Sequence, residues 1–345
     1  MKKYISIILT LAVTAFSLSA CGSKTADDSS ETIASDNSVN TEVSDEETLE
    51  IVTTIFPEYD WVREVLGDNL DQAEVTMLLD DGVDLHSYQP TAEDILKISD
   101  CDLFIYVGGE SDEWVEGALK EAVNKDMKVI NLLEVLGDTV KEEEVVEGME
   151  AEEEGEEEGE GEGEEEPEYD EHVWLSIKNA AIFSQVIADT LAEIDPENAD
   201  TYQNNAAAYG EKLSALDNEY QAAVDAATQK TLLFGDRFPF RYLVDDYGLS
   251  YYAAFVGCST ETEASFETIT FLAGKVDELA LNAVLTIEKS DQKIAKTIIE
   301  NTENKNGQIL TLDSMQSTTL EDALGGTTYL SVMENNLTVL REALQ

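Results

Sequence analysis

The spacing of apolar residues along the chain alternates between a strand pattern and a helix pattern. Residues 49–55 form a β-branched apolar run, which predicts a buried strand. From residue 59 to residue 66 the apolar positions recur at helical spacing, and Gly67 follows at a C-cap position. The same alternation recurs further along the chain. It predicts mostly parallel sheets covered by helices.

One predicted helix is much longer than the other elements. The predicted strands are 49–55, 73–79, 101–107, 127–133, 231–234, 249–255, 283–288 and 308–312. The predicted helices are 59–66, 91–98, 112–124, 177–194, 196–228, 237–246, 265–279, 290–302 and 327–344. At about 1.5 Å per residue, some 30 residues of helix 196–228 span about 45 Å. The predicted fold class is α/β, with an N-terminal lobe 49–195 and a C-terminal lobe 229–345 joined by this helix.

The first residues carry an export pattern rather than a fold element. Residues 1–20 combine two lysines with an apolar run, which predicts a signal peptide. Small residues precede Cys21, and this arrangement resembles a bacterial lipobox; the alternative is an ordinary cleavage site with an incidental cysteine. We expect an acylated Cys21 to anchor the protein to the membrane on its extracytoplasmic side. Residues 21–48 are polar and predict a disordered, lipidated tether.

Charge narrows the possible partners. The chain carries a formal net charge of −55, which argues against nucleic acid and against electrostatic docking to anionic lipid. Because a strongly negative chain attracts cations, divalent cations are the expected small partners. Much of it is local, because residues 142–171 contain 18 Glu interleaved with Gly. We interpret 141–170 as a disordered insert that either gathers cations or serves only as a solubilising loop.

The chain contains only two histidines, and both lie in acidic loops. His86 follows a predicted strand, at the edge of the sheet where open α/β folds usually bind ligands. His172 follows an acidic stretch and precedes a predicted helix. A histidine in a loop is often an idle, solvent-exposed side chain. Because neutral imidazole is a common ligand of zinc and also binds manganese and iron, we interpret the pair as half of a metal site.

The other half of this site needs further donors, since zinc usually takes four ligands. Asp236 and Asp313 each follow a predicted strand of the C-terminal lobe, which places the metal in the cleft between the lobes. Either aspartate can instead serve as a helix N-cap. Cys101 begins an apolar run and is interpreted as a small buried hydrophobe. Whether Cys101 and Cys258 are free thiols is left open.

Four segments resemble the zinc/manganese solute-binding lipoproteins of ABC-type metal importers. These segments are TTIFP at 53–57, GVDLHSY at 82–88, EHVWL at 171–175 and DPENA at 195–199. They cover nearly the whole mature chain in the family's order. The resemblance implies two α/β lobes, a rigid spanning helix and a metal buried between the lobes. It also implies that His86 and His172 are the first two ligands and Asp313 the last.

The third ligand position departs from the family's pattern. Counting back from residues 247–249 places this position at Arg237, whose guanidinium stays protonated and cannot bind a metal. Asp236 is the neighbouring substitute. The reserve candidates are Glu261, Glu263 and Glu288. Two histidines with two carboxylates suit either zinc or manganese, and we choose zinc, with manganese second.

The resemblance implies a binding protein rather than an enzyme. Such a protein captures zinc as a monomer and delivers it to an ABC-type permease in the membrane. A metal-dependent surface adhesin is one alternative. A metal-dependent hydrolase is another, and it is disfavoured because the sequence contains neither a His-Glu-x-x-His helix nor a nucleophile elbow.

Overall fold

The computed structural model describes residues 48–150, 168–259 and 263–345. The strands are β1 Leu49–Thr53, β2 Ala73–Met77, β3 Leu103–Tyr106, β4 Lys128–Asn131, β5 Thr231–Phe238, β6 Ser250–Val256, β7 Ala283–Thr286 and β8 Gln308–Thr311. The α-helices are α1 Phe56–Leu66, α2 Ala92–Asp100, α3 Trp114–Glu121, α4 Leu132–Leu136, α5 Ile177–Ile194, α6 Ala199–Ala226, α7 Arg241–Tyr247, α8 Phe266–Leu279, α9 Lys293–Asn301, α10 Leu320–Leu324 and α11 Tyr329–Ala343. The 3₁₀ helices are η1 Gly67–Gln72, η2 Leu85–Ser87, η3 Glu110–Asp112, η4 Gly137–Thr139 and η5 Val173–Leu175.

These strands form two sheets, one in each lobe. The strand orders are β2-β1-β3-β4 and β6-β5-β7-β8, and every neighbouring pair runs parallel. The predicted α/β fold class with two parallel-sheet lobes is therefore confirmed. Because parallel strands end at the same edge of a sheet, the loops that follow them gather on one side of each lobe.

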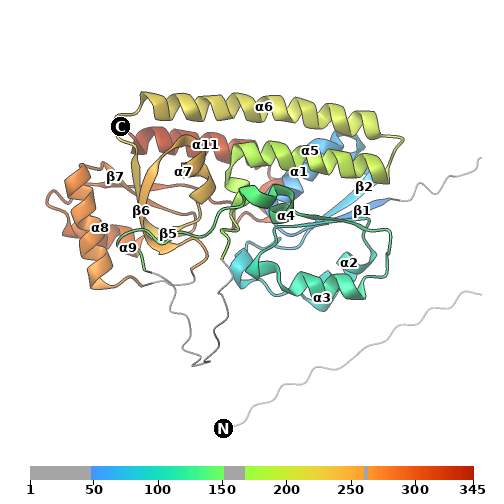
Figure 1. Cartoon of the computed structure of the whole chain (residues 1–345), viewed down its shortest axis with the longest axis horizontal. Coiled ribbons are helices and arrows are strands. Elements are labelled where there is room, and N and C mark those ends of the chain that lie inside the picture. Colours follow the sequence, from blue (N-terminus) through green and yellow to red (C-terminus); the bar gives the residue numbers. More distant parts are fainter. Residues whose placement is uncertain (1–47, 151–167, 260–262) are drawn as a thin grey trace, which may run out of the picture. The chain divides into compact units, whose positions relative to one another are not determined.

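Helix α6 connects the two lobes. It has 28 residues and is therefore about 42 Å long. Near its start, Asn205 Nδ2 donates a hydrogen bond to Val65 O of α1, at 2.9 Å. Further along, the Tyr220 hydroxyl donates to Met333 O of α11, at 2.6 Å. Figure 1 shows α6 lying along α5 and α11, so one rigid element contacts both lobes.

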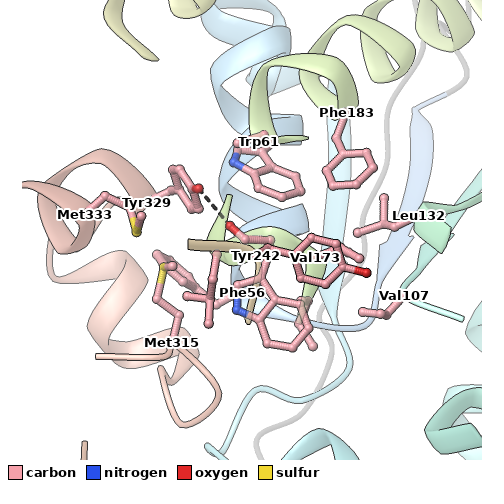
Figure 2. Close-up of a cluster of buried hydrophobic side chains, with 14 of the residues drawn as sticks. Phe56, Trp61, Val107, Leu132, Val173, Phe183, Tyr242, Met315, Tyr329 and Met333 are labelled. Atoms are coloured by element: carbon pink, nitrogen blue, oxygen red, sulfur yellow. Dashed lines mark hydrogen bonds between the residues drawn. The ribbon is translucent and has the colours of Figure 1, made fainter. Parts of the chain in front are cut away.

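The larger of two apolar clusters among the described residues runs through both lobes. It includes Phe56 and Trp61 of α1 together with Tyr242 of α7 and Met315 after β8, and Figure 2 shows these side chains in one cluster. The rings of Trp61 and Tyr329 lie 5.3 Å apart between centroids. Truncating such a buried aromatic residue typically costs about 3–5 kcal/mol. The loops of the interlobe cleft therefore rest on a shared, densely packed base.

The course of β5 differs from the prediction. The strand continues to Phe238, and its pairing with β6 shifts register between Phe234 and Arg237. Asp236 and Arg237 therefore lie inside a strand and not in a loop after it. Pro239 favours an extended conformation at the residue before it, which accounts for the later start of α7. The short helices α4 and α10 were not predicted.

The predicted disordered insert 141–170 is ordered at both of its ends. Glu143 N donates to Glu168 O and Asp170 N donates to Lys141 O, each at 2.9 Å. Glu150 N donates to Ala254 O at 2.9 Å, along the edge strand β6. The prediction of disorder is thus wrong for these flanks, because backbone pairing and apolar residues among the glutamates outweigh like-charge repulsion.

Several predictions fall on residues outside the described ranges. These are the signal peptide 1–20, Cys21, nearly all of the tether 21–48 and residues 151–167 of the insert. Among the helices within residues 48–150, 168–259 and 263–345, none combines the length and the apolar character that a bilayer span requires.

Candidate metal centre

His86 is positioned by η2, the short helix in the loop after β2. Asp84 caps this helix, and its Oδ1 accepts a hydrogen bond from the His86 N–H at 3.1 Å. Leu85 is buried and attaches the turn to the core. The cap and the apolar anchor directly precede the histidine and fix its backbone, so the Asp-Leu-His sequence builds the first half of the site locally.

His172 is fully buried, with 0% of its surface exposed. Asp170 Oδ1 accepts a hydrogen bond from the His172 N–H at 2.9 Å and lies 3.1 Å from the ring Nδ1. One carboxylate therefore fixes both the backbone and the ring of this histidine. Trp174 packs against the ring, with 5.2 Å between centroids, and its Nε1 donates to Ser314 O of the C-terminal lobe at 2.8 Å.

The two histidine rings meet at their Nε2 atoms, which lie 3.1 Å apart. Two Zn–N bonds of about 2.0–2.1 Å at a tetrahedral angle separate their nitrogens by about 3.3 Å. The Nδ1 atom of each ring contacts an oxygen, from Asp170 for His172 and from Ser111 for His86, at 3.1 and 2.8 Å. Such outer contacts fix the orientation of metal-binding imidazoles. The rings therefore present a pair of nitrogens at the spacing that one metal ion needs.

Glu171 is a buried acid beside His86. Its Oε1 accepts a hydrogen bond from Ser111 N at 2.9 Å, and its Oε2 lies 3.4 Å from His86 Nδ1. Burial alone raises the pKa of a carboxyl, but the hydrogen bonds and charge of His86, together with Ser111, hold the pKa of Glu171 below its ordinary value. A negative charge is therefore kept next to the imidazole, where it favours a bound cation.

Cys258 joins the two histidines. One ring nitrogen of each histidine and the Cys258 Sγ all lie within 4.8 Å of one another. Cys258 follows β6, so it occupies the carboxyl edge of its sheet. Before it, Gly257 comes so close to the His172 ring that a Cβ there would lie 3.0 Å from the ring Cε1. Burial and the nearby charge of Asp170 raise the pKa of the Cys258 thiol well above its usual value.

A cavity of ≈ 270 Å³ opens on His86 and Cys258. Four glutamates line this cavity: Glu110, Glu143, Glu168 and Glu171. Glu143 and Glu168 belong to the ordered flanks of the insert. Acidic walls raise the local concentration of cations, so this cavity offers an approach to the histidines that suits a divalent ion.

The predicted carboxylate ligands do not join this group. The Oδ1 of Asp236 accepts from Arg237 N at 3.0 Å, and its Oδ2 from Ile287 N at 3.4 Å. The Oδ1 of Asp313 accepts from Met315 N at 2.8 Å, and burial beside Glu288 raises the pKa of Asp313 to about 6. Asp313 nevertheless lies in the loop that Trp174 contacts, so it remains a predicted ligand.

The reserve candidates are also placed apart from the histidines. Both oxygens of Glu288 accept hydrogen bonds from the Ser314 hydroxyl, at 2.9 and 3.0 Å, and Ser317 adds a further bond. Glu263 is an exposed side chain, and its charge interacts with that of Lys293, which is exposed as well. Glu261 lies outside the described residues.

The chain was compared with known families. The model of a family described as zinc-uptake complex component A, periplasmic, matches residues 51–343. The chain belongs to this family. The predicted resemblance is thereby confirmed.

Individual relatives are named as zinc-binding or zinc-uptake proteins. Zinc-binding lipoprotein AdcA of Streptococcus pneumoniae is 33% identical over 296 residues, which is 85% of this chain and 55% of AdcA. The chain thus spans about half the length of the first curated relatives it matches. High-affinity zinc uptake system protein ZnuA of Bacillus subtilis is 30% identical over 86% of this chain and 88% of ZnuA. The Zn(II)-bound ZnuA-like domain of S. pneumoniae AdcA has a TM-score of 0.65 at 31% identity, covering 86% of this chain and 99% of that domain.

Arg237 occupies the position where the resemblance predicts the third ligand. Its guanidinium forms an ion pair with Asp84, the residue that caps η2. The hydrogen bonds and charge of Arg237 outweigh the effect of burial and lower the pKa of Asp84. At the position where the resemblance predicts a ligand, this chain therefore has a cation that ties the C-terminal lobe to the loop carrying His86.

Sequence reasoning missed four residues that shape the site: Ser111, Asp170, Glu171 and Cys258. Asp170 and Glu171 directly precede His172, and this adjacency was an available signal. Ser111 lies 25 positions from His86, and only the packing of η2 against η3 brings the two together. For Cys258 the signal was its place after a predicted strand.

Proposed function

We propose that this chain captures a zinc ion outside the cytoplasm and delivers it to an ABC-type membrane importer. The observation that carries this proposal is the pair of Nε2 atoms 3.1 Å apart, with each Nδ1 contacted by an oxygen. Family membership and the names of the relatives support the same role. Zinc is the transported substrate, and the chain performs no bond-making chemistry of its own.

In this proposal, His86 and His172 bind the ion through their imidazole nitrogens. Asp313 supplies an oxygen after its carboxylate turns away from Met315 N. Manganese is the second candidate metal. The acidic cavity beside His86 provides the route by which the ion enters, since the ionised glutamates among its lining residues attract a divalent cation before the imidazoles replace its water.

We further propose that acylated Cys21 holds one copy of the chain at the membrane, where it meets its permease. Relatives named as lipoproteins support the anchor. No contact among the described residues favours an adhesin or a hydrolase over metal capture.

A competition titration tests the central proposal. The full chain and its His86→Ala/His172→Ala double variant compete with a chromophoric chelator for zinc. We expect submicromolar affinity in the full chain and its loss in the double variant. Ser87→Ala is the matched control, because Ser87 is exposed in the same 3₁₀ turn and should leave zinc affinity unchanged. Submicromolar affinity in the double variant would refute the proposal.

A further inference from the structure

The two histidines supply too few donors for a zinc ion, which usually takes four ligands. At the third position, Arg237 is bound to Asp84 and cannot coordinate a metal. Its neighbour Asp236 has both carboxylate oxygens directed at backbone N–H groups. Beside the oxygen proposed for Asp313, a further protein donor must therefore come from another residue close to the rings.

Cys258 is the residue whose position meets this need. Its sulfur and a ring nitrogen of each histidine lie within 4.8 Å of one another. Zinc keeps a bound nitrogen and a bound sulfur about 3.6 Å apart, because Zn–N and Zn–S bonds are about 2.05 and 2.3 Å. The remaining gap is therefore at most about 1 Å, and rotation about the Cα–Cβ bond from one rotamer to another moves a cysteine sulfur by about 3 Å.

The backbone around Cys258 is also adapted to this position. Gly257 lies so close to the His172 ring and to Phe238 O that a Cβ would lie 3.0 and 2.9 Å from them. A side chain at residue 257 would push the turn away from the ring. Cys258 N in turn donates to Glu143 Oε1 at 3.4 Å, so an insert flank also contacts the turn. The carboxyl end of β6 is thus held against the histidines from two sides.

We propose that Cys258 is the third protein ligand, so that the chain binds zinc through two imidazole nitrogens and one thiolate. This inference rests on the proposed function and names the metal more narrowly. As the Zn–S bond forms, the thiol S–H bond breaks and its proton passes to solvent. Soft thiolate favours zinc over manganese, which prefers oxygen ligands. A carboxylate or water occupies the fourth position.

Cobalt substitution and titration test this assignment in the full chain with Cys21→Ser, which removes the N-terminal thiol. The cobalt-loaded protein should show a near-ultraviolet sulfur-to-cobalt charge-transfer band. Cys258→Ser should abolish that band and weaken zinc binding more than the about 10–100-fold typical of losing an outer-shell partner. Manganese affinity should change little. Cys258→His should restore much of the zinc affinity without the band.

Cys101→Ala is the matched control, because Cys101 is buried in the N-terminal lobe and its Sγ contacts Met127 Sδ at 3.4 Å. This variant should keep both the band and the zinc affinity. Alkylation of Cys258 in the Cys101→Ala chain gives a second readout that does not depend on folding of the Cys258 variants: zinc should slow it strongly. Unchanged zinc affinity in Cys258→Ser, no band in the parent, or alkylation unaffected by zinc would overturn the assignment. If the parent binds no zinc, the proposed function itself fails.

Discussion

The polar side chains on the two sides of the interlobe cleft make different contacts. On the N-terminal side, His86 and His172 use Nδ1 for contacts with protein oxygens and turn Nε2 toward each other. On the C-terminal side, Asp236 and Asp313 direct carboxylate oxygens at backbone N–H groups. The histidine side is arranged to receive a cation, while these aspartates stabilise their own strands and turns.

This difference shows that an acidic residue after a strand is weak support for a metal ligand. What matters is whether its donor atoms are already bonded within the protein. Before Asp236 or Asp313 can bind a metal, its hydrogen bonds with backbone N–H groups must break. In the histidine pair, the contact between the rings is replaced directly by two metal–nitrogen bonds.

The largest expected effect within this comparison comes from Asp170. In Asp170→Asn the amide oxygen can still accept from the His172 N–H, but the negative charge that supports the imidazole is lost. Loss of an outer-shell partner typically costs about 10–100-fold in metal affinity. We expect zinc affinity to fall by that factor in a competition titration, with little change in thermal unfolding of the metal-free chain. Unchanged zinc affinity would show that Asp170 only shapes the backbone.

Two buried glutamates of the N-terminal lobe have pKa values that are shifted in opposite directions. Glu58 lies at the start of α1 and its Oε2 accepts hydrogen bonds from Thr54 N, the Thr54 hydroxyl and Ile55 N, at 2.8, 3.0 and 3.2 Å. Burial raises its pKa to about 8, whereas Glu171, beside His86, has a lowered pKa. Burial alone therefore does not set the pKa of a carboxyl here, because its hydrogen-bond partners and neighbouring groups also contribute.

Because the pKa of Glu58 is higher in the folded protein, its contribution to stability is fully present below about pH 4.5 and is lost as pH rises through about 8. Within that window it changes the free energy of unfolding by about 1.4 kcal/mol per pH unit. Glu58→Gln removes this slope, and urea unfolding of the metal-free chain at several pH values measures it. An identical pH dependence in the parent and the variant would contradict the raised pKa.

The smallest expected effect is that of Asp236. Asp236→Asn keeps an oxygen for Arg237 N and replaces the oxygen that accepts from Ile287 N, at 3.4 Å, with an amide nitrogen. We expect zinc affinity to change by no more than about threefold, equivalent to about 0.6 kcal/mol. The same titration as for Asp170→Asn measures it, and the two variants serve as matched Asp→Asn controls. A fall of a hundredfold would instead restore Asp236 as a ligand.

Local patterns in the sequence predicted the eight strands of the described residues, the long helix and both histidine segments, because apolar spacing and turn residues act over short distances. The course of β5 was missed because pairing with β6 extends it past Asp236. Cys258 was missed because its role depends on a contact with residues 86 and 172, which are distant in sequence. A contact of this kind arises from packing, and the place of Cys258 after a predicted strand does not by itself reveal it.

Zinc K-edge X-ray absorption on the zinc-loaded full chain tests most directly whether His86 and His172 hold the ion together. Our account predicts two imidazole nitrogens at about 2.0–2.1 Å, with the outer-ring scattering typical of histidine. In His172→Ala the imidazole contribution should fall by half or zinc should be lost. A shell of oxygen alone, or a spectrum that His172→Ala leaves unchanged, would contradict it.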